Sequence, residues 1–254
     1  MSQKIRQEQI LQILKKQGYV TVRYLSDALQ YSIATINRDL NTMQRQGLVK
    51  RSYGGVEAIA QKRLPPLLQR QFYHKKEKRL IAKAAVERIE NGDTIFLDGS
   101  TTVQYMVPFL LQKKDLTVIT NSLRLAIELG DSPLTIICLG GKMIERPYVL
   151  YGDETIENAM RYLPDKMFFS VNAVTESGQI PHSYLMYKLM IKNSREAWFL
   201  TDRTKLVPQL DRILCDFSAL TGVISDFEFP KETKELYPDV TFISVDESNP
   251  PSKA

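Results

Sequence analysis

From residue 77 to the end of the chain, short apolar segments alternate with longer amphipathic ones. Short apolar segments are typical of buried strands, whereas the amphipathic stretches have the spacing of helices. Strands that alternate with helices run parallel in one sheet. Helical spacing is clearest at residues 77–89, and a further helical stretch is expected after Thr102, through Leu111. Strands are predicted at residues 94–97, 116–120, 134–139, 166–171, 197–201, 219–225 and 240–245. This part of the chain is therefore predicted to be an α/β domain with a mostly parallel sheet.

Charge is divided unevenly along the 254 residues. The first 80 residues contain 16 lysines and arginines against 5 acidic residues, a net charge of +11. The remaining residues contain 18 against 24, a net charge of −6. A basic front on an acidic body indicates that the front binds a polyanion. The length is sufficient for two domains.

The first 58 residues have the pattern of three helices followed by a hairpin. Ser2, Thr21 and Ser32 can each begin a helix, and Gly18 and Gly47 can end the first and third. In the third helix Ile36, Leu40 and Met43 are spaced to form one apolar face. Residues 48–56 read as two short strands around a turn. The pattern predicts a helix-turn-helix with a wing.

The polar side of the third helix is suited to reading DNA. Arg38 can reach guanine or phosphate, and Asn37 can pair with adenine. Lys50 and Arg51 in the wing are placed to meet phosphate or the minor groove. The alternative is a small helical bundle whose polar faces are merely solvated. The candidate DNA-binding residues are Thr21, Ser32, Ala34, Thr35, Asn37, Arg38, Lys50, Arg51 and Tyr53.

Residues 59–76 are predicted to be a linker. They contain Pro65-Pro66 among glutamine, lysine and arginine, a composition that interrupts regular structure. The predicted domains are therefore residues 1–58, which bind DNA, and residues 77–254, which bind an effector.

Several predicted strands end in small and polar residues. In a parallel sheet, ligands bind beyond the carboxyl ends of the strands. Glycine, hydroxyl groups and helix-terminal amides together can hold a phosphate. The alternative is that Ser100 or Thr101 only caps a helix and that Asp98 only ends a strand. The candidate effector-binding residues are Asp98, Gly99, Ser100, Thr101, Thr102, Thr120, Asn121, Ser122, Gly140, Gly141 and Lys205.

Motifs along nearly the whole chain carry a family resemblance. In the body they include Gly92-Asp93-Thr94-Ile95-Phe96-Leu97-Asp98-Gly99-Ser100-Thr101-Thr102, Glu77-Lys78 with Ile81-Ala82, Thr120-Asn121-Ser122-Leu123, Leu139-Gly140-Gly141, Gly152 and Asp202-Arg203-Thr204-Lys205. At the front they are Ser32-Ile33-Ala34-Thr35-Ile36-Asn37-Arg38-Asp39-Leu40, Gln46-Gly47 and Arg51-Ser52-Tyr53-Gly54-Gly55-Val56. In order and spacing they resemble the DeoR family of bacterial transcription regulators.

This resemblance implies a winged helix-turn-helix repressor whose effector domain is similar to sugar-phosphate isomerases. Members of the family commonly control sugar or polyol operons and respond to phosphorylated intermediates. The chain departs from the family pattern at four places. Asn37 replaces an arginine and Tyr53 a histidine, residues 171–173 replace a Gly-x-Asp segment, and an acidic residue is missing near Ser183. These departures affect base preference and the rear of the effector pocket.

The expected partners are double-stranded operator DNA, a phosphorylated sugar or polyol, and further copies of the chain in a dimer or tetramer. We expect no cofactor, no metal ion and no contact with a membrane. We expect the protein to be located in the cytoplasm. Cys138 and Cys215 are expected to be reduced, buried thiols. Two alternatives remain open. One is an isomerase-like enzyme using Asp98 and Lys205, and the other is a DNA-binding protein without ligand control. The sequence does not identify the effector, the operator, or whether ligand releases or promotes DNA binding.

Overall fold

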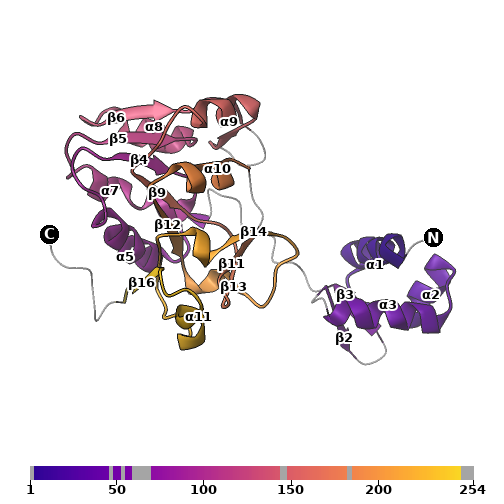
Figure 1. Ribbon diagram of the computed structural model, residues 1–254. Coiled ribbons are helices and arrows are strands. Elements are labelled where there is room, and N and C mark those ends of the chain that lie inside the picture. Colours follow the sequence, from indigo (N-terminus) through magenta and orange to yellow (C-terminus); the bar gives the residue numbers. More distant parts are fainter. Residues whose placement is uncertain are drawn as a thin grey trace. The chain divides into compact units, whose positions relative to one another are not determined.

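The structure is a computed structural model that describes residues 3–45, 48–52, 55–58, 70–143, 148–181 and 185–246. The chain divides into two compact units, Met1–Arg63 and Leu64–Ala254 (Figure 1). Several residues singled out by the sequence lie outside the described ranges. They are Ser2, Gln46, Gly47, Tyr53, Gly54, most of the predicted linker, Ser183 and Tyr184.

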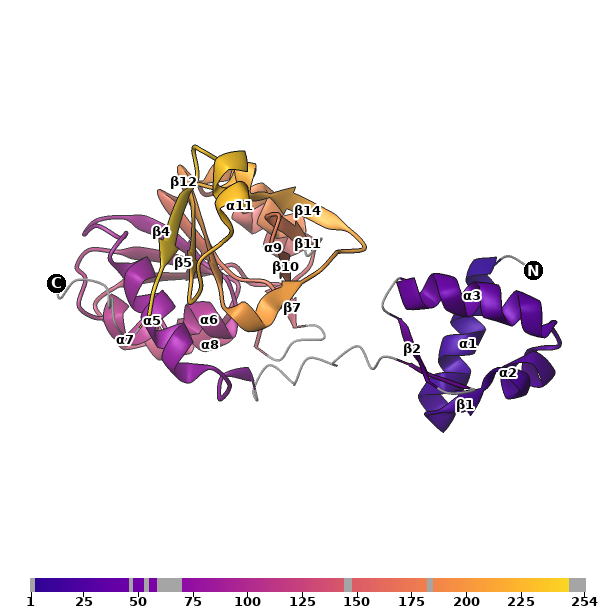
Figure 2. The same ribbon diagram turned by 90° about the horizontal axis from the view of Figure 1, so that it is seen from below.

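In its described residues the first unit contains three helices and a three-stranded antiparallel sheet (Figure 2). The helices are α1 (Gln3–Gln17), α2 (Val22–Leu29) and α3 (Ile33–Arg45). The strands are β1 (Val20–Thr21), β2 (Val49–Ser52) and β3 (Gly55–Ala58), in the order β1-β3-β2. The predicted helix-turn-helix with a wing is confirmed. The sequence missed β1, which is only two residues long.

Local signals explain the ends of these helices. Gly18 directly follows α1 and has a φ of +73°, a conformation that favours glycine at the end of a helix. At the start of α2, the hydroxyl of Thr21 accepts a hydrogen bond from the amide of Tyr24. Ser32 accepts the amide of Thr35 at the start of α3. On α3 the predicted face of Ile36, Leu40 and Met43 is fully buried. That face packs with α1, α2 and the sheet into one hydrophobic core.

A buried ion pair joins α1 to α3. The guanidinium of Arg6 binds the carboxylate of Asp39, which is completely buried, through two of its nitrogens. The same guanidinium lies 4.8 Å from the centre of the Tyr31 ring. Asp39 therefore stabilises the packing of α1 against α3. It does so although it belongs to the motif at residues 32–40 that resembles the family's DNA-binding helix.

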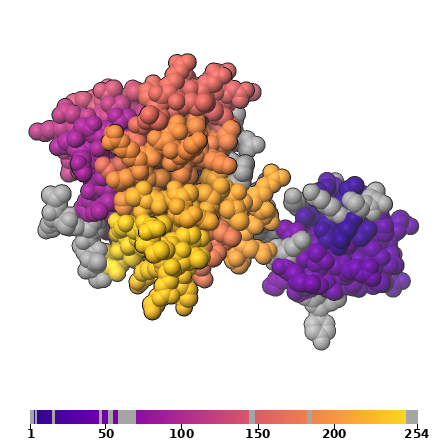
Figure 3. Space-filling model, in the orientation of Figure 1, coloured from indigo at the N-terminus to yellow at the C-terminus, as the bar shows by residue number. Residues whose placement is uncertain are grey.

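The second unit is built on a seven-stranded sheet in which every neighbouring pair is parallel. The strand order is β16-β15-β12-β9-β4-β5-β6. The strands are β4 (Thr94–Leu97), β5 (Thr117–Thr120), β6 (Thr135–Cys138), β9 (Lys166–Phe169), β12 (Glu196–Thr201), β15 (Gly222–Ser225) and β16 (Thr241–Ser244). The predicted mostly parallel α/β domain is confirmed. The pink segments around β6 and the yellow segments around β16 lie at opposite ends of the unit (Figure 3).

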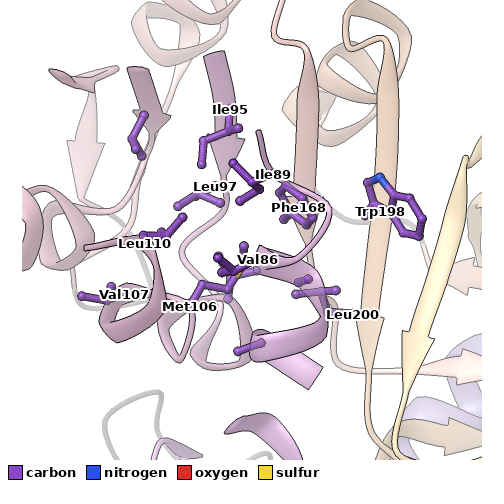
Figure 4. Packing of buried hydrophobic residues seen from close by; sticks show 14 of the residues in the cluster. Val86, Ile89, Ile95, Leu97, Met106, Val107, Leu110, Phe168, Trp198 and Leu200 are labelled. Atoms are coloured by element: carbon purple, nitrogen blue, oxygen red, sulfur yellow. The ribbon is translucent and has the colours of Figure 1, made fainter. Parts of the chain in front are cut away.

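Helices cover both faces of this sheet. One face packs on α5 (Lys75–Val86), α6 (Thr101–Gln104), α7 (Val107–Leu110) and α8 (Leu123–Gly130). The other packs on α9 (Asp153–Ala159), on α10 (Leu185–Asn193) and on Phe229 and Tyr237, which flank α11 (Lys231–Leu236). Successive strand residues point to opposite faces, so Ile95 and Leu97 enter the first core and Phe96 the second. Figure 4 shows part of the first core, in which Ile95, Leu97, Phe168, Trp198 and Leu200 of the strands face the side that carries Val86, Met106, Val107 and Leu110.

Short strand pairs and 3₁₀ turns lie around the sheet. The pairs are β7 (Lys142–Met143) with β8 (Leu150–Tyr151), β10 (Val174–Thr175) with β13 (Leu206–Val207), and β11 (Gln179–Pro181) with β14 (Ile213–Asp216). The turns are η1 (Arg203–Lys205) and η2 (Phe217–Ala219).

The structure corrects three expectations for this unit. The helix expected at residues 77–89 is α5, which begins at Lys75 and ends at Val86. The long helix expected after Thr102 is divided into α6 and α7. Cys138 is exposed because β6 is an edge strand, whereas Cys215 is half-buried. In the described ranges no helix combines the length and the apolar character needed to cross a bilayer.

Candidate effector and DNA-binding sites

Asp98 begins the loop after β4, at the carboxyl end of the central strands. Its side chain is completely buried, but both carboxylate oxygens have partners. One oxygen accepts the amide of Ser100 at 3.1 Å. The other accepts the Tyr187 hydroxyl at 2.8 Å and the Ser170 amide at 3.3 Å. Burial raises the pKa of Asp98, and these hydrogen bonds oppose the rise. Asp98 thus joins the loops after β4 and β9 to α10.

Lys205, in the loop after β12, reaches the same place. Its ammonium donates to the hydroxyl of Ser170 at 2.6 Å and to that of Thr102 at 2.9 Å. It also lies 3.6 Å from Asp202, and its side chain is only 15% exposed. Burial lowers the pKa of Lys205, against the effect of Asp202 and Asp98. The loops after β4, β9 and β12 therefore meet around one buried cation.

Asp202 supplies the negative charge beside this cation. Burial by itself would raise the pKa of Asp202, but Lys205 and the hydrogen bond from Thr204 hold it below its usual value. Asp202 is therefore an ionised carboxylate in a buried setting, where an unpaired charge is costly.

Two further cations lie near Lys205, and sequence reasoning assigned neither to the site. Lys78 on α5 is buried and donates to the carbonyls of Arg70 and Tyr73 at 2.6 and 2.9 Å. Burial, with the nearby charge of Lys205, lowers the pKa of Lys78 to about 8. Arg70 donates to the Asn172 side chain at 2.7 Å, and its charge acts on both lysines. Three cations thus converge on one place.

A signal for Lys78 was present in the sequence. Lys78, Ile81, Ala82 and Ala85 have helical spacing, and all four are buried on one face of α5. The run of charged residues at 75–79 is typical of a solvent-exposed surface, so the sequence does not show that Lys78 alone among its lysines is buried. Arg70 carried no such signal, because it lies in the segment that reads as linker.

The loop from Gly99 to Thr102 lies beside these cations. Ser100 accepts the amide of Val103 at 3.2 Å and so caps α6. The amides of Thr101 and Thr102 have no partner among the described residues, as is usual in the first turn of a helix. Ser100 therefore has the structural role of a helix cap, and the two amides after it lie beside Lys205, which donates to Thr102.

The loop after β5 uses its polar groups mainly to hold the backbone. Thr120 donates to the Leu97 carbonyl at 2.7 Å, which joins β5 to β4. Ser122 caps α8 through the amide of Leu125. Asn121 donates to the Leu150 carbonyl at 3.0 Å, and its side-chain oxygen is buried without a partner among the described residues.

Gly140 and Gly141 follow the edge strand β6. The Gly140 carbonyl accepts the Thr155 hydroxyl at 2.7 Å. A Cβ on Gly141, whose φ is +109°, would lie 2.0 Å from the Thr155 oxygen. Close packing on α9 thus explains Gly141, whereas a φ of +73° favours glycine at position 140. No hydrogen bond between described residues joins them to Asp98 or Lys205.

In the first unit, the candidate DNA-binding residues that the structure describes lie on α3, on β2 and at the start of α2. Ala34 and Arg38 are exposed on α3, and Thr35 is half-exposed with its hydroxyl 2.9 Å from that of Ser32. On β2, Lys50 is exposed and lies 3.9 Å from Glu57. Thr21 is exposed at the start of α2.

Arg51 on β2 has an arrangement that the sequence did not predict. Its two terminal nitrogens donate to the side-chain oxygens of Asn37 at 2.5 Å and Asn41 at 2.7 Å. Arg51 was expected to meet phosphate or the minor groove, and Asn37 to pair with adenine. The structure joins these two candidates to each other, and their contacts with DNA stay predictions.

Comparison with known proteins agrees with this architecture. Residues 6–62 match the model of the DeoR-like helix-turn-helix domain, and residues 73–227 match that of the DeoR C terminal sensor domain. The chain is 34% identical to the lactose phosphotransferase system repressor of Lactococcus lactis subsp. lactis, with 81% of this chain and 84% of that protein covered. It is 27% identical to the glycerol-3-phosphate regulon repressor of Escherichia coli (strain K12), with 94% and 97% covered.

Among solved structures, ribose 5-phosphate isomerase A from Methanocaldococcus jannaschii overlaps 52% of the chain. The TM-score is 0.40, the sequence identity is 18%, and 55% of that structure is covered. The two domain models account for both units in order, and neither describes an enzyme. The chain belongs to the DeoR family of DNA-binding transcriptional regulators.

Proposed function

We propose that this regulator represses a carbohydrate uptake or catabolism operon and that a phosphorylated sugar or polyol controls its binding to the operator. The observation that carries the effector class is the convergence of Arg70, Lys78 and Lys205 at the carboxyl ends of the strands. Two carboxylates, Asp98 and Asp202, accompany these three cations. A phosphate dianion would bring compensating charge and strong acceptors to this buried place.

The neutral groups around the cations suit the remainder of such a ligand. Hydroxyl groups of Thr102 and Ser170 lie at Lys205, and the Tyr187 hydroxyl lies at Asp98. A sugar or polyol can exchange hydrogen bonds with hydroxyls and with a buried carboxylate. The names of the Lactococcus lactis and Escherichia coli relatives, which refer to lactose and glycerol-3-phosphate systems, support the same class.

Control of DNA binding requires that ligand binding alter the connection between the units. Lys78 donates to the carbonyls of Arg70 and Tyr73, and the Tyr105 hydroxyl donates to the carbonyl of Gln71 at 2.6 Å. Arg70, Gln71 and Tyr73 lie at the end of the predicted linker, directly before α5. A phosphate that draws the Lys78 ammonium toward itself would weaken two of these three hydrogen bonds. On this basis the segment from Arg70 to Tyr73 transmits the signal, and the functional form is a dimer or tetramer on a symmetric operator.

A thermal-shift screen tests the effector class. The full-length protein is heated with triose, glycerol, pentose and hexose phosphates, each beside its unphosphorylated parent. A ligand at 100 times its dissociation constant adds roughly 2.7 kcal/mol of stability. The midpoint should rise by about 2–4 °C for each kcal/mol. At least one phosphate should produce this shift while its parent does not.

Two variants assign that shift to the site. Lys205→Met should abolish it, whereas Lys114→Met, which removes an exposed lysine before β5, should preserve it. A ligand that shifts the wild type and also changes its affinity for operator DNA supports control by metabolite. Operator binding that no stabilising phosphate alters would favour a DNA-binding protein without ligand control.

A further inference from the structure

The guanidinium of Arg51 is fixed by two side chains from another element. Asn37 and Asn41 are separated by one helical turn on α3, so their amides lie one above the other. Each accepts one hydrogen bond from a different terminal nitrogen of Arg51, at 2.5 and 2.7 Å. Two bonds from one planar group define both its position and its orientation. Arg51 is thus carried by the wing strand β2 but held against the recognition helix α3.

The remaining capacity of Arg51 is large. A guanidinium has five N–H donors, of which the two asparagines use two. Both asparagines are neutral, so the charge of Arg51 is not compensated by them. Lys50, the preceding residue, lies near Glu57 instead. Arg51 therefore presents a charged donor group of fixed orientation beside the exposed residue Asn41.

The same bonds restrict what Asn37 can do. Pairing with adenine needs the amide to accept with its oxygen and donate with its nitrogen to the same base edge. The oxygen of Asn37 already accepts from Arg51, and its orientation follows from that bond. Asn37 is half-buried, whereas Arg38, its neighbour, is exposed.

We propose that Arg51 is a base-reading residue that recognises guanine in the major groove and that Asn37 and Asn41 are positioning residues for it. Guanine offers two acceptors, O6 and N7, to which an oriented guanidinium donates in a bidentate manner. The reading surface of the protein then consists of α3 together with one side chain delivered from the wing.

Selection from a pool of duplexes with a randomised central segment tests this assignment. Full-length wild type and the variants Arg51→Ala, Arg51→Lys and Asn37→Ala are each used to select DNA. Arg51→Ala should lose a preference for guanine at one base pair in each half-site. The loss of discrimination there should be on the order of 5- to 150-fold. Arg51→Lys keeps the charge but cannot donate to both amides in the same plane, so it should lose the same preference.

Asn37→Ala should weaken the preference at that same base pair. The affinity of Asn37→Ala/Arg51→Ala for the wild-type site should equal that of Arg51→Ala within a factor of about three, because residues acting as one unit are not additive. Lys50→Ala is the control for loss of a phosphate contact, because such a loss should weaken the binding of all DNA sequences by the same factor. Thermal unfolding of each variant checks that the first unit is intact.

Three results would overturn the proposal. The first is that Asn37→Ala relaxes a base pair different from that of Arg51→Ala. The second is that the losses of the two single variants multiply in the double variant. The third is that Arg51→Ala weakens all sequences equally, as Lys50→Ala is expected to do, since that would make Arg51 a phosphate contact.

Discussion

Lys78 and Lys205 carry ammonium groups that the fold removes from water. Both are held by oxygen atoms, Lys78 by two backbone carbonyls and Lys205 by two hydroxyls. Burial lowers the pKa of each, to about 8 for Lys78. With a pKa of about 8, Lys78 loses its positive charge as the pH rises a little above the physiological range. A role of Lys78 in binding a ligand can therefore be tested by measuring affinity as a function of pH.

We expect the affinity for a phosphate ester to fall as pH rises through about 8. The ligand is already a dianion above pH ~6, so the change belongs to the protein. Above its pKa, Lys78 must regain a proton before it can bind the phosphate. Calorimetric titration between pH 7 and pH 9.5 should show this loss, and Lys78→Arg, which stays protonated, should flatten the profile. The same profile in both proteins would contradict the assignment.

The stability of the unliganded protein should change in the opposite direction. The folded-state pKa of Lys78 is below its ordinary value of 10.5, so the unfolded chain binds more protons between about pH 8 and that value. The contribution of Lys78 to stability therefore rises with pH across this window. If ligand affinity falls with pH while the stability of the unliganded protein rises, the loss of affinity is not caused by a general destabilisation at high pH. It then reflects the role of Lys78 in binding the phosphate.

Arg38 provides a residue-scale test of DNA binding. It is exposed on α3, away from the buried face of Ile36, Leu40 and Met43. Arg38→Ala should cost about 1–3 kcal/mol of operator affinity because a base or phosphate contact is lost. Thermal unfolding should be unchanged. If a folded variant bound operator with wild-type affinity, α3 would have no reading role at this position.

Close contacts between elements explain several glycines at the scale of strands and loops. A Cβ on Gly55 would lie 2.4 Å from the Tyr19 ring, where β3 passes β1. A Cβ on Gly99 would lie 2.6 Å from Cγ2 of Val149, which precedes β8. Gly99 is therefore required where the loop after β4 meets the β7–β8 region, whether or not a phosphate binds beside it.

Gly99→Ala should destabilise the second unit by about 1–3 kcal/mol, the usual cost of overpacking. Val149→Ala removes both of the methyl groups that the new Cβ would meet. The double variant should therefore be more stable than the sum of the two single changes predicts. Urea unfolding followed by the fluorescence of Trp198 measures this coupling, because Trp198 lies in the core of the same unit. Simple additivity would show that the Val149 contact does not decide the requirement for glycine.

At the scale of the whole molecule, the two units carry different charge and different tasks. The first 80 residues have a net charge of +11, so operator affinity should fall steeply with salt through the release of counterions. The rest of the chain has a net charge of −6. The proposed regulation depends on energetic coupling between the units, and a substitution confined to one unit can test for that coupling.

Ser100→Glu should bind operator normally and fail to respond to the effector. The new carboxylate would repel a phosphate beside Thr101 and Lys205, while loss of the α6 cap should cost about 1 kcal/mol. Operator titrations with and without effector on wild type, Ser100→Glu and the uncharged control Ser100→Ala make the comparison. A wild-type response in Ser100→Glu would show that the phosphate binds elsewhere. A permanently altered operator affinity would show that the glutamate imitates the phosphate.

Periodicity and end signals in the sequence were sufficient for the architecture. The face of Ile36, Leu40 and Met43, the cap at Thr21 and the alternation of strands and helices after residue 77 are local properties, which neighbouring residues determine. The loop from Asp98 to Thr102 could be located for the same reason, because the carboxyl ends of parallel strands share one edge of the sheet.

Only the tertiary structure decided which of these residues act together. Lys78 binds carbonyls from the segment before α5, Lys205 connects the loops after β4 and β9, and Arg51 binds two asparagines on α3. The partners of Lys205 are 35 and 103 positions away, and one partner of Arg51 is 14 positions away. The sequence determined the elements because their signals are short-range. Its charged residues acquired their roles only when folding removed them from water and supplied distant partners, since a side chain's pKa and orientation depend on its surroundings in space.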